Sequence, residues 1–145
     1  MISPYQPHQR DEIMALWLES TLSGHPFIAE HHWHESYSIV RDIYIPHSKT
    51  WVCLQNEKPL GFVSVINEVF IGALFVTPSH ADRGVGSQLL SHVQARYPVF
   101  ILEVYQKNQR AVNFYQRMGF RIEEAAWQHD TQHPTWIMTW KKETS

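Results

Sequence analysis

A polar loop with two glycines joins an apolar run to an expected helix at residues 75–90, which read FVTPSHADRGVGSQLL. The first N–H groups of a helix lack intrahelical partners and lie at the positive end of its dipole, so such a loop suits an anion. Gly84 and Gly86 have no Cβ and would let the backbone approach that anion closely. His80 and Arg83 add donors nearby. The same loop is also consistent with a tight turn that binds no ligand.

Two well-known nucleotide-binding motifs do not match this loop. A P-loop carries a lysine directly after its second glycine, whereas Ser87 follows Gly86 here. A Rossmann fingerprint needs a third glycine at the position of Leu89 and a strand that opens a βαβ unit, whereas this apolar run follows an expected hairpin. A phosphate held by the loop therefore belongs to another kind of ligand.

A second segment, LEVYQKNQRAVNFYQRMGF at residues 102–120, places Asn108 at a strand-to-helix turn and Tyr115 seven residues later. Together with the loop it resembles the GNAT superfamily of acetyl-coenzyme A-dependent N-acetyltransferases, whose signature is Q/R-x-x-G-x-G/A before a helix and a later N-x-x-A-x-x-F/L-Y-x-x-x-G-F. Ala81 departs from the first position, which removes one side-chain contact but leaves the backbone amides. The later part matches fully, at Asn108, Ala111, Phe114, Tyr115, Gly119 and Phe120.

Within the superfamily, the chain resembles small stand-alone bacterial enzymes that acetylate protein amines, and its LEV, Asn and Tyr spacing is also that of ribosomal-protein alanine acetyltransferases. The resemblance implies that the pyrophosphate of acetyl-coenzyme A lies on the loop amides and its pantetheine arm between the strands ending at Val76 and Tyr105. An amide near Val76 would polarise the thioester carbonyl. The implied cofactor-binding residues are Phe75, Val76, Asp82, Arg83, Gly84, Val85, Gly86, Ser87 and Asn108.

Acetyl transfer to an amine requires two proton movements. A lysine amine, with a free pKa of about 10.4, must lose a proton before it attacks, and Glu103 is the candidate base, directly or through water. The leaving thiolate needs a donor, and Tyr115 is the candidate acid, with direct transfer in a ternary complex. The alternatives are a solvated edge position for Glu103 and a core position for Tyr115.

The acceptor site is expected beside the first two helices and the last strands. Its candidate residues form an apolar collar around an alkyl amine, made of His25, Phe27, Phe70 and Trp136. Glu124 or Asp130 would attract the charge of the amine.

Two other groups of residues have side chains that can act as a nucleophile or as metal ligands, but their sequence context disfavours both roles. Cys53 lies inside an apolar strand without a basic neighbour in the sequence, so a buried thiol is expected instead of a nucleophile. The histidines of HHWH, at positions 31, 32 and 34, lack the i, i+4 spacing of a helical metal pair, so solvated side chains and no metal are expected.

The elements that position these residues predict an α/β fold with a mixed sheet, helices on both faces and the order β-α-α-β-β-β-α-β-α-β-β, and the resemblance implies that this fold is of the GNAT type. "VFIGALFV" is continuously apolar, as in a central strand covered on both faces. The expected helices cover residues 9–21, 30–45, 85–97 and 108–118, and the expected strands residues 1–5, 50–55, 60–66, 69–76, 99–105, 120–127 and 135–140.

Length, charge and cysteine content limit the domain organisation, partners and compartment that are expected for this chain. The 145 residues are expected to form a single domain, residues 1–145, and the net charge of −2 gives no pull toward nucleic acid or a membrane. One cysteine and the lack of a signal peptide or long apolar run favour the cytoplasm. A protein lysine or N-terminus is the favoured acceptor. The alternatives are a small-molecule amine, a non-catalytic acyl-coenzyme A-binding module and an RNA-acetylating toxin, and the oligomeric state stays open.

Overall fold

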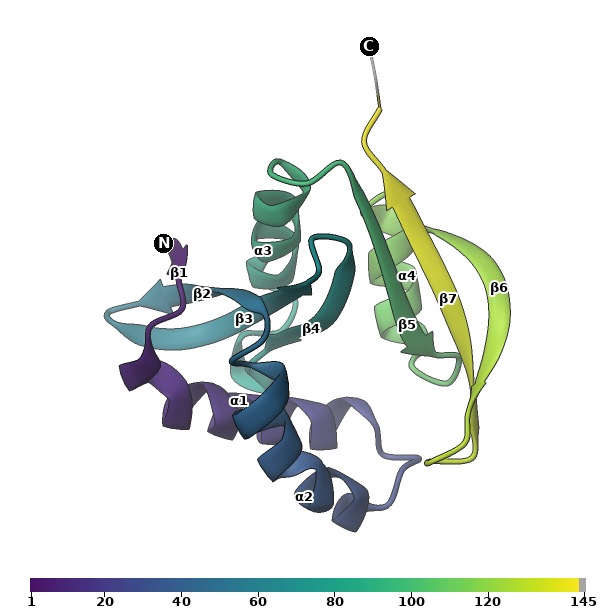
Figure 1. Ribbon diagram of the computed structural model, residues 1–145, viewed down its shortest axis with the longest axis horizontal. Coiled ribbons are helices and arrows are strands. Elements are labelled where there is room, and N and C mark those ends of the chain that lie inside the picture. The colour runs from purple at the N-terminus through teal and green to yellow at the C-terminus, as the bar shows by residue number, and fades with distance from the viewer. Residues whose placement is uncertain (144–145) are drawn as a thin grey trace.

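The computed structural model describes residues 1–143 and contains a seven-stranded mixed sheet with the strand order β1-β2-β3-β4-β5-β7-β6 (Figure 1). The predicted fold class and the predicted order of elements are confirmed. The elements are β1 (Ile2–Pro4), α1 (Arg10–Gly24), α2 (Glu30–Ile39), β2 (Lys49–Gln55), β3 (Lys58–Ile66), β4 (Phe70–Val76), α3 (Val85–Gln94), β5 (Val99–Tyr105), α4 (Gln109–Arg117), β6 (Arg121–Gln128) and β7 (His133–Lys141), with short turns η1 (Pro7–Gln9), η2 (Val40–Tyr44) and η3 (Pro78–His80).

The hairpin between β2 and β3 turns on two residues, Asn56 and Glu57. Their φ angles are 51° and 64°, which is the left-handed backbone that a two-residue type I′ turn requires. The sequence predicted this hairpin with a four-residue link, NEKP. The paired strands therefore extend further toward the turn than their apolar residues indicate.

The second helix is shorter than predicted and ends in a wider turn. Regular α-helix stops at Ile39, and η2 continues it as a π-helical turn in which the N–H of Ile45 donates to the carbonyl of Val40 at 3.0 Å. The predicted range, residues 30–45, therefore contains both, and Pro46 follows directly.

Strands β4 and β5 are neighbours in the sheet but pair only at their beginnings. Phe70 lies opposite Ile101, whose N–H donates to the carbonyl of Val69 at 2.9 Å, and the strands then diverge (Figure 1). As predicted, β4 is covered on both faces, since Ala73 and Phe75 pack on the α1 side and Leu74 and Val76 on the α3 side, although only Ile71 of this strand is fully buried. The later residues of β4 border the space that opens between the two strands.

Two apolar clusters hold the two faces of the sheet. The cluster on the α3 and α4 face includes Leu89, Leu90, Val93, Phe100, Leu102 and Met138. The cluster on the α1 face includes Ile13, Met14, Trp17, Val52 and Phe62. None of the helices in residues 1–143 has the length and apolar character needed to cross a membrane.

Replacing Gly61 of β3 by Ala should destabilise the fold by about 1–3 kcal/mol, because the added methyl overpacks the junction of β3, β4 and α3. A Cβ at this position would lie 2.8 Å from the carbonyl oxygen of Phe75 and 3.1 Å from Leu89 and Val85. Urea unfolding measures the change. Gly24→Ala is the control, since a Cβ there meets no atom within 4 Å. Equal stabilities for the two variants would contradict this packing.

Candidate active site

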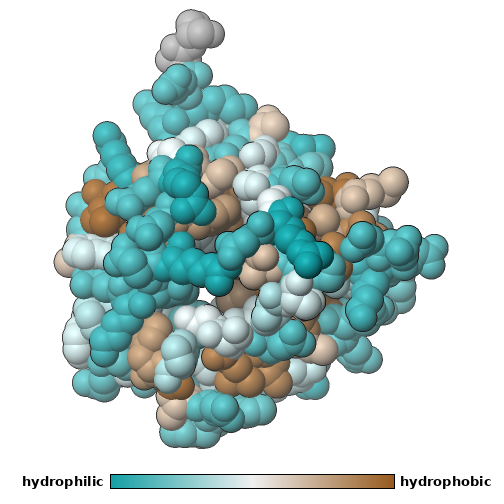
Figure 2. All heavy atoms as spheres, turned by 180° about the vertical axis from the view of Figure 1, so that it is seen from behind, coloured by the Kyte–Doolittle hydropathy of each residue, from teal (hydrophilic) through white to brown (hydrophobic). Residues whose placement is uncertain are grey.

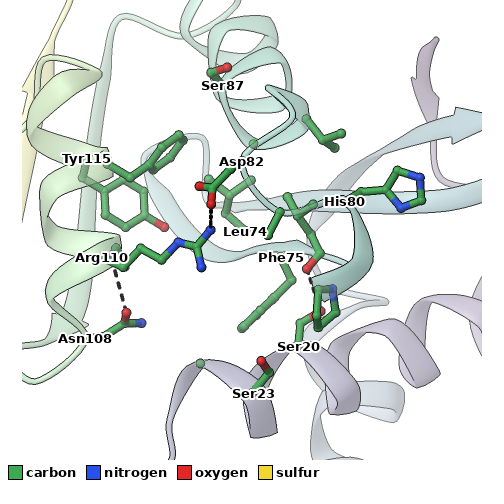
Figure 3. Close-up of a pocket in the computed structure, with 18 of the residues that line it drawn as sticks. Ser20, Ser23, Leu74, Phe75, His80, Asp82, Ser87, Asn108, Arg110 and Tyr115 are labelled. Carbon is green, nitrogen blue, oxygen red and sulfur yellow. Dashed lines mark hydrogen bonds and ion pairs between the residues drawn. The ribbon is translucent and has the colours of Figure 1, made fainter.

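A pocket of about 630 Å³ lies beside the end of β4, beyond the point where this strand pairs with β5. Its walls come from the end of α1, the end of β4, the loop before α3 and one face of α4 (Figure 3). Seen from behind, the surface is hollowed near its centre and strongly hydrophilic side chains border the hollow (Figure 2). The pocket thus joins segments that are far apart in the sequence, from Ser20 to Met118.

The glycine loop enters α3 in the conformation that an anion site needs. Gly84 has a φ of +82° and precedes the first helical residue, Val85. The hydroxyl of Ser87 donates to the carbonyl of Gly84 at 3.0 Å and closes the turn. Of the predicted loop residues, Asp82, Gly84, Val85, Gly86 and Ser87 line the pocket, whereas Arg83 does not. The helix N-terminus therefore opens into the pocket, with its first amides on the pocket side of α3.

An ion pair crosses the mouth of the pocket from α4 to the loop. The guanidinium of Arg110 contacts the carboxylate of Asp82, and both side chains are largely exposed (Figure 3). Exposed ion pairs contribute about 0–1 kcal/mol, so a phosphate group can compete with Asp82 for this guanidinium. Arg110 was not predicted from the sequence, although it follows Asn108 by two residues in the second motif.

The end of β4 presents two backbone N–H groups toward the pocket. Thr77 N–H donates to Leu60 at 2.8 Å, and alternation in this antiparallel pair then directs the N–H groups of Leu74 and Val76 away from β3. A bulge at Gly72 precedes them, because Ser64 and Val65 pair with Ala73 and Ile71. The predicted residues Phe75 and Val76 both line the pocket.

Asn108 begins α4 and lines the pocket. Its side-chain oxygen accepts the N–H of Ala111 at 3.3 Å, as an N-cap residue does. Because the cap uses the oxygen, the amide NH₂ group is the part of this side chain that can bind a ligand.

Tyr115 combines a packed ring with a hydroxyl in the pocket. The ring meets Phe114 and Phe120 edge-on at centroid distances of 5.3 and 5.6 Å, and the hydroxyl points into the pocket (Figure 3). Gly119, with a φ of +94°, ends α4 and lets the N–H of Phe120 donate to the carbonyl of Tyr115 at 2.9 Å. Burial raises the pKa of Tyr115 above its ordinary value, so the phenol keeps its proton at neutral pH.

Glu103 lies on β5, but it is not part of the pocket wall. Its two carboxylate oxygens accept hydrogen bonds from Gln128 at 3.0 Å and from the hydroxyl of Thr135 at 2.6 Å. Of the two predicted catalytic side chains, only Tyr115 is brought into the pocket. Glu103 would need a bridging water molecule to accept a proton from a ligand in the pocket.

The predicted collar does not form as one unit. His25 lines the pocket and contacts Phe27 at a ring centroid distance of 5.8 Å, and Tyr105 meets both rings at 5.4 and 5.6 Å. Phe70 is 37% exposed at the opposite end of the strand pair, next to Ile101.

Trp136 is separated from this cluster by the sheet. It packs on the α3 and α4 face, against the cluster that contains Val104 and Met138. Thr135 beside it bonds Glu103, and side chains alternate between faces along a strand. Trp136 therefore points away from His25 and Phe27, and the structure does not place it in the collar.

The remaining candidates differ in outcome, since Cys53 takes its expected position and the acidic candidates do not reach the pocket. Cys53 is buried in the core. His31 and His34 are exposed on α2, as predicted, whereas His32 is half-buried and its ring contacts Trp33. Within residues 1–143, no three His, Cys, Asp or Glu side chains gather as ligands for a metal ion. The acidic candidates Glu124 and Asp130 are exposed and lie outside the pocket wall.

Sequence reasoning placed the first two helices beside the acceptor site but did not identify Ser20 of α1 as a pocket residue. Ser20, Ser23 and Gly24 line the pocket, and the hydroxyl of Ser20 donates to the carbonyl of Val76 at 3.0 Å. Nothing in the local sequence of this helix indicates a ligand, because its position against β4 is a tertiary contact. The helix anchors the strand whose amides face the pocket.

Comparisons with known proteins agree with this architecture. The model of the acetyltransferase (GNAT) family matches residues 10–120. Peptidyl-lysine N-acetyltransferase YiaC of Escherichia coli K12 is 49% identical over 140 residues, which are 97% of this chain and 96% of that protein.

Two solved structures have the same fold. Apo YjaB from Escherichia coli superposes with a TM-score of 0.84 at 24% identity and covers 97% of this chain and 96% of its own. PaiA N-acetyltransferase from Thermoplasma acidophilum, in complex with coenzyme A, superposes with a TM-score of 0.81 at 15% identity and covers 98% of each chain.

Proposed function

Because the chain belongs to the GNAT family and is an acetyl-coenzyme A-dependent N-acetyltransferase, we propose that its acceptor is a lysine side chain of a protein. The observation that carries this proposal is the similarity, over nearly the whole chain, to a relative named for acetylation of peptidyl lysine. The proposal treats residues 1–145 as one acetyltransferase domain. It assigns the pocket beside the end of β4 to the acetyl donor.

The features of the pocket fit the parts of acetyl-coenzyme A. Loop amides at the start of α3, from Gly84 to Ser87, would hold the pyrophosphate, with Arg110 as a further cation. The N–H groups of Leu74 and Val76 would pair with the pantetheine arm as an added strand would, and Asn108 would bind it from α4. The N–H of Val76 would then polarise the thioester carbonyl.

The transfer itself is proposed to occur directly between the two bound substrates. The ammonium of the lysine loses one proton to a base, and its nitrogen forms the new bond to the thioester carbon. The carbon–sulfur bond then breaks, and Tyr115 supplies a proton to the leaving thiolate. The raised pKa of this phenol keeps it protonated until the thiolate forms.

Release of the coenzyme A thiol tests the acceptor class. A peptide with one lysine and a blocked N-terminus should support release and gain an acetyl group on that lysine, as mass spectrometry would locate it. The same peptide with acetyl-lysine in place of lysine is the negative control. The competing acceptors are a lysine-free peptide with an unblocked N-terminus and a set of small amines. Faster turnover of either competing acceptor would contradict the lysine assignment.

Phe70→Ala should raise KM or lower kcat for the amine by several-fold, while coenzyme A binding stays intact. Phe70 offers an exposed apolar ring at the start of β4, beside the point where the two strands separate. Steady-state kinetics with varied peptide measure the change. Ile122→Ala removes an equally exposed strand residue of β6 as a control. Kinetics equal to the control would remove Phe70 from the acceptor site.

A further inference from the structure

The imidazole of His25 is held in one tautomer at the pocket wall. Its Nδ1 lies 2.8 Å from the carbonyl oxygen of Thr21 and 3.1 Å from the hydroxyl of the same residue. A carbonyl oxygen only accepts hydrogen bonds, so Nδ1 must donate. The neutral ring then carries its proton on Nδ1 and leaves a lone pair on Nε2, the atom that can accept a proton.

Aromatic side chains from three segments fix the plane of this ring. Trp33 of α2 lies 5.0 Å away between centroids, Tyr105 of β5 5.4 Å and Phe27 5.8 Å. Within the described residues, the buried side-chain nitrogens and oxygens without a partner are Trp33 Nε1 and His92 Nε2. Nε2 of His25 has no hydrogen-bond partner among the described residues and is not one of these buried atoms, and His25 lines the pocket.

Burial lowers the pKa of His25, an effect that exceeds the opposing hydrogen bond to Thr21. The ordinary pKa of histidine is about 6.5, so the ring is neutral at pH 7. A base must be unprotonated before it acts, and this environment supplies that form. Its function should be lost only as the pH falls below about 6.5, through the lowered pKa of the folded protein.

We infer that Nε2 of His25, instead of Glu103, takes the proton from the ammonium of the acceptor. This inference rests on the proposed lysine acetylation, because it assigns the base of that same site. His25 lines the pocket with Tyr115, whereas both carboxylate oxygens of Glu103 are engaged by Gln128 and Thr135.

The protons balance in this scheme. The ammonium gives its first proton to Nε2, and the resulting neutral amine attacks the thioester carbon. After the carbon–nitrogen bond has formed, the nitrogen loses a second proton, which replaces the proton that Tyr115 donates to the leaving thiolate. The imidazolium returns its proton to water, so the products are an acetylated lysine, the coenzyme A thiol and one released proton.

Other titratable groups surround His25 and belong to the same pH response. Tyr105 touches the ring directly, and burial raises the pKa of its phenol, so it stays neutral. The groups one residue further out are His32 against Trp33, His133 and Lys107 against Phe27, and Glu103 and Asp130 near Tyr105. A pH profile must therefore be compared with that of a variant that lacks only the imidazole.

His25→Gln is the decisive variant, because glutamine is polar and of similar size but does not take up a proton near neutral pH. It should lower kcat by about 10²-fold or more, abolish the acidic limb of the kcat profile, and leave coenzyme A affinity within about twofold of wild type. Added imidazole should restore turnover in His25→Ala. His34→Gln, at an exposed histidine of α2, is the matched control and should behave as wild type.

The outcomes separate the two proposals. If wild type acetylates a lysine peptide and His25→Gln matches His34→Gln, the base assignment fails alone, and Glu103→Gln would then be expected to lose activity. If wild type acetylates no lysine, both proposals fail. Should His25→Gln not fold, nitrogen-15 spectra of wild type decide the question, since a neutral His25 protonated on Nε2 would overturn the inference.

Discussion

Tyr115→Phe is expected to lower kcat by about 10²-fold, which corresponds to about 2.7 kcal/mol of lost transition-state stabilisation. The variant loses only the phenolic hydroxyl, which points into the pocket, and keeps the ring contacts with Phe114 and Phe120. Thermal stability and coenzyme A affinity should therefore stay close to wild type. Thiol release measures kcat, and calorimetry with coenzyme A measures the affinity separately.

The pH profile adds a second signature of this acid. The pKa of Tyr115 is raised by burial, so wild-type kcat should keep its full value up to at least about pH 10 before an alkaline limb begins. Tyr97→Phe, which changes a tyrosine outside this pocket, is the control. A Tyr115→Phe enzyme with wild-type kcat would show that the thiolate leaves without this proton donor.

Ser87→Asp is expected to weaken coenzyme A binding by at least about tenfold, or 1.4 kcal/mol, without destabilising the protein. Ser87 is the third residue of α3, where a carboxylate interacts favourably with the helix dipole by about 0.3–1 kcal/mol. The same carboxylate would repel a pyrophosphate held by the loop amides. Binding and stability should therefore change in opposite directions.

Ser87→Asn is the matched neutral control, because it has nearly the same shape as aspartate and no charge. Calorimetry with coenzyme A measures affinity, and the melting temperature reports on stability. An affinity equal to that of the asparagine variant would mean that the loop is a structural turn and that the pyrophosphate binds elsewhere. This comparison therefore distinguishes an anion-binding loop from a tight turn that binds no ligand.

Local sequence patterns predicted the elements well where each pattern is complete within a few residues. Gly119, which follows the last turn of α4, marks the end of that helix both in the sequence and in the structure, where its φ is +94°. Asn108 likewise begins α4 by capping Ala111. The β4 strand was harder, because continuous apolar character does not reveal that its partner β5 diverges after one residue pair.

The predicted site residues differ in the same way, because the positions of some depend on local sequence and those of others on tertiary contacts. Residues of the two motifs reach the pocket together, since the loop before α3 and the start of α4 both line it. Trp136 failed to join the collar because strand alternation and sheet packing, which depend on distant residues, turn it to the α3 and α4 face. Glu103 was correctly placed on β5, but its hydrogen bonds come from β6 and β7.

The sequence by itself determined the family resemblance, the order of elements, the glycine turn before α3 and the position of Tyr115 on α4, because these depend on short-range spacing. Only the tertiary structure decided which residues share the pocket with that tyrosine. The packing of α1 against β4 brings the end of this helix, and with it His25, to a pocket shared with Tyr115, ninety residues later in the chain. Such contacts arise from burial of apolar surface between whole elements, which no local spacing encodes.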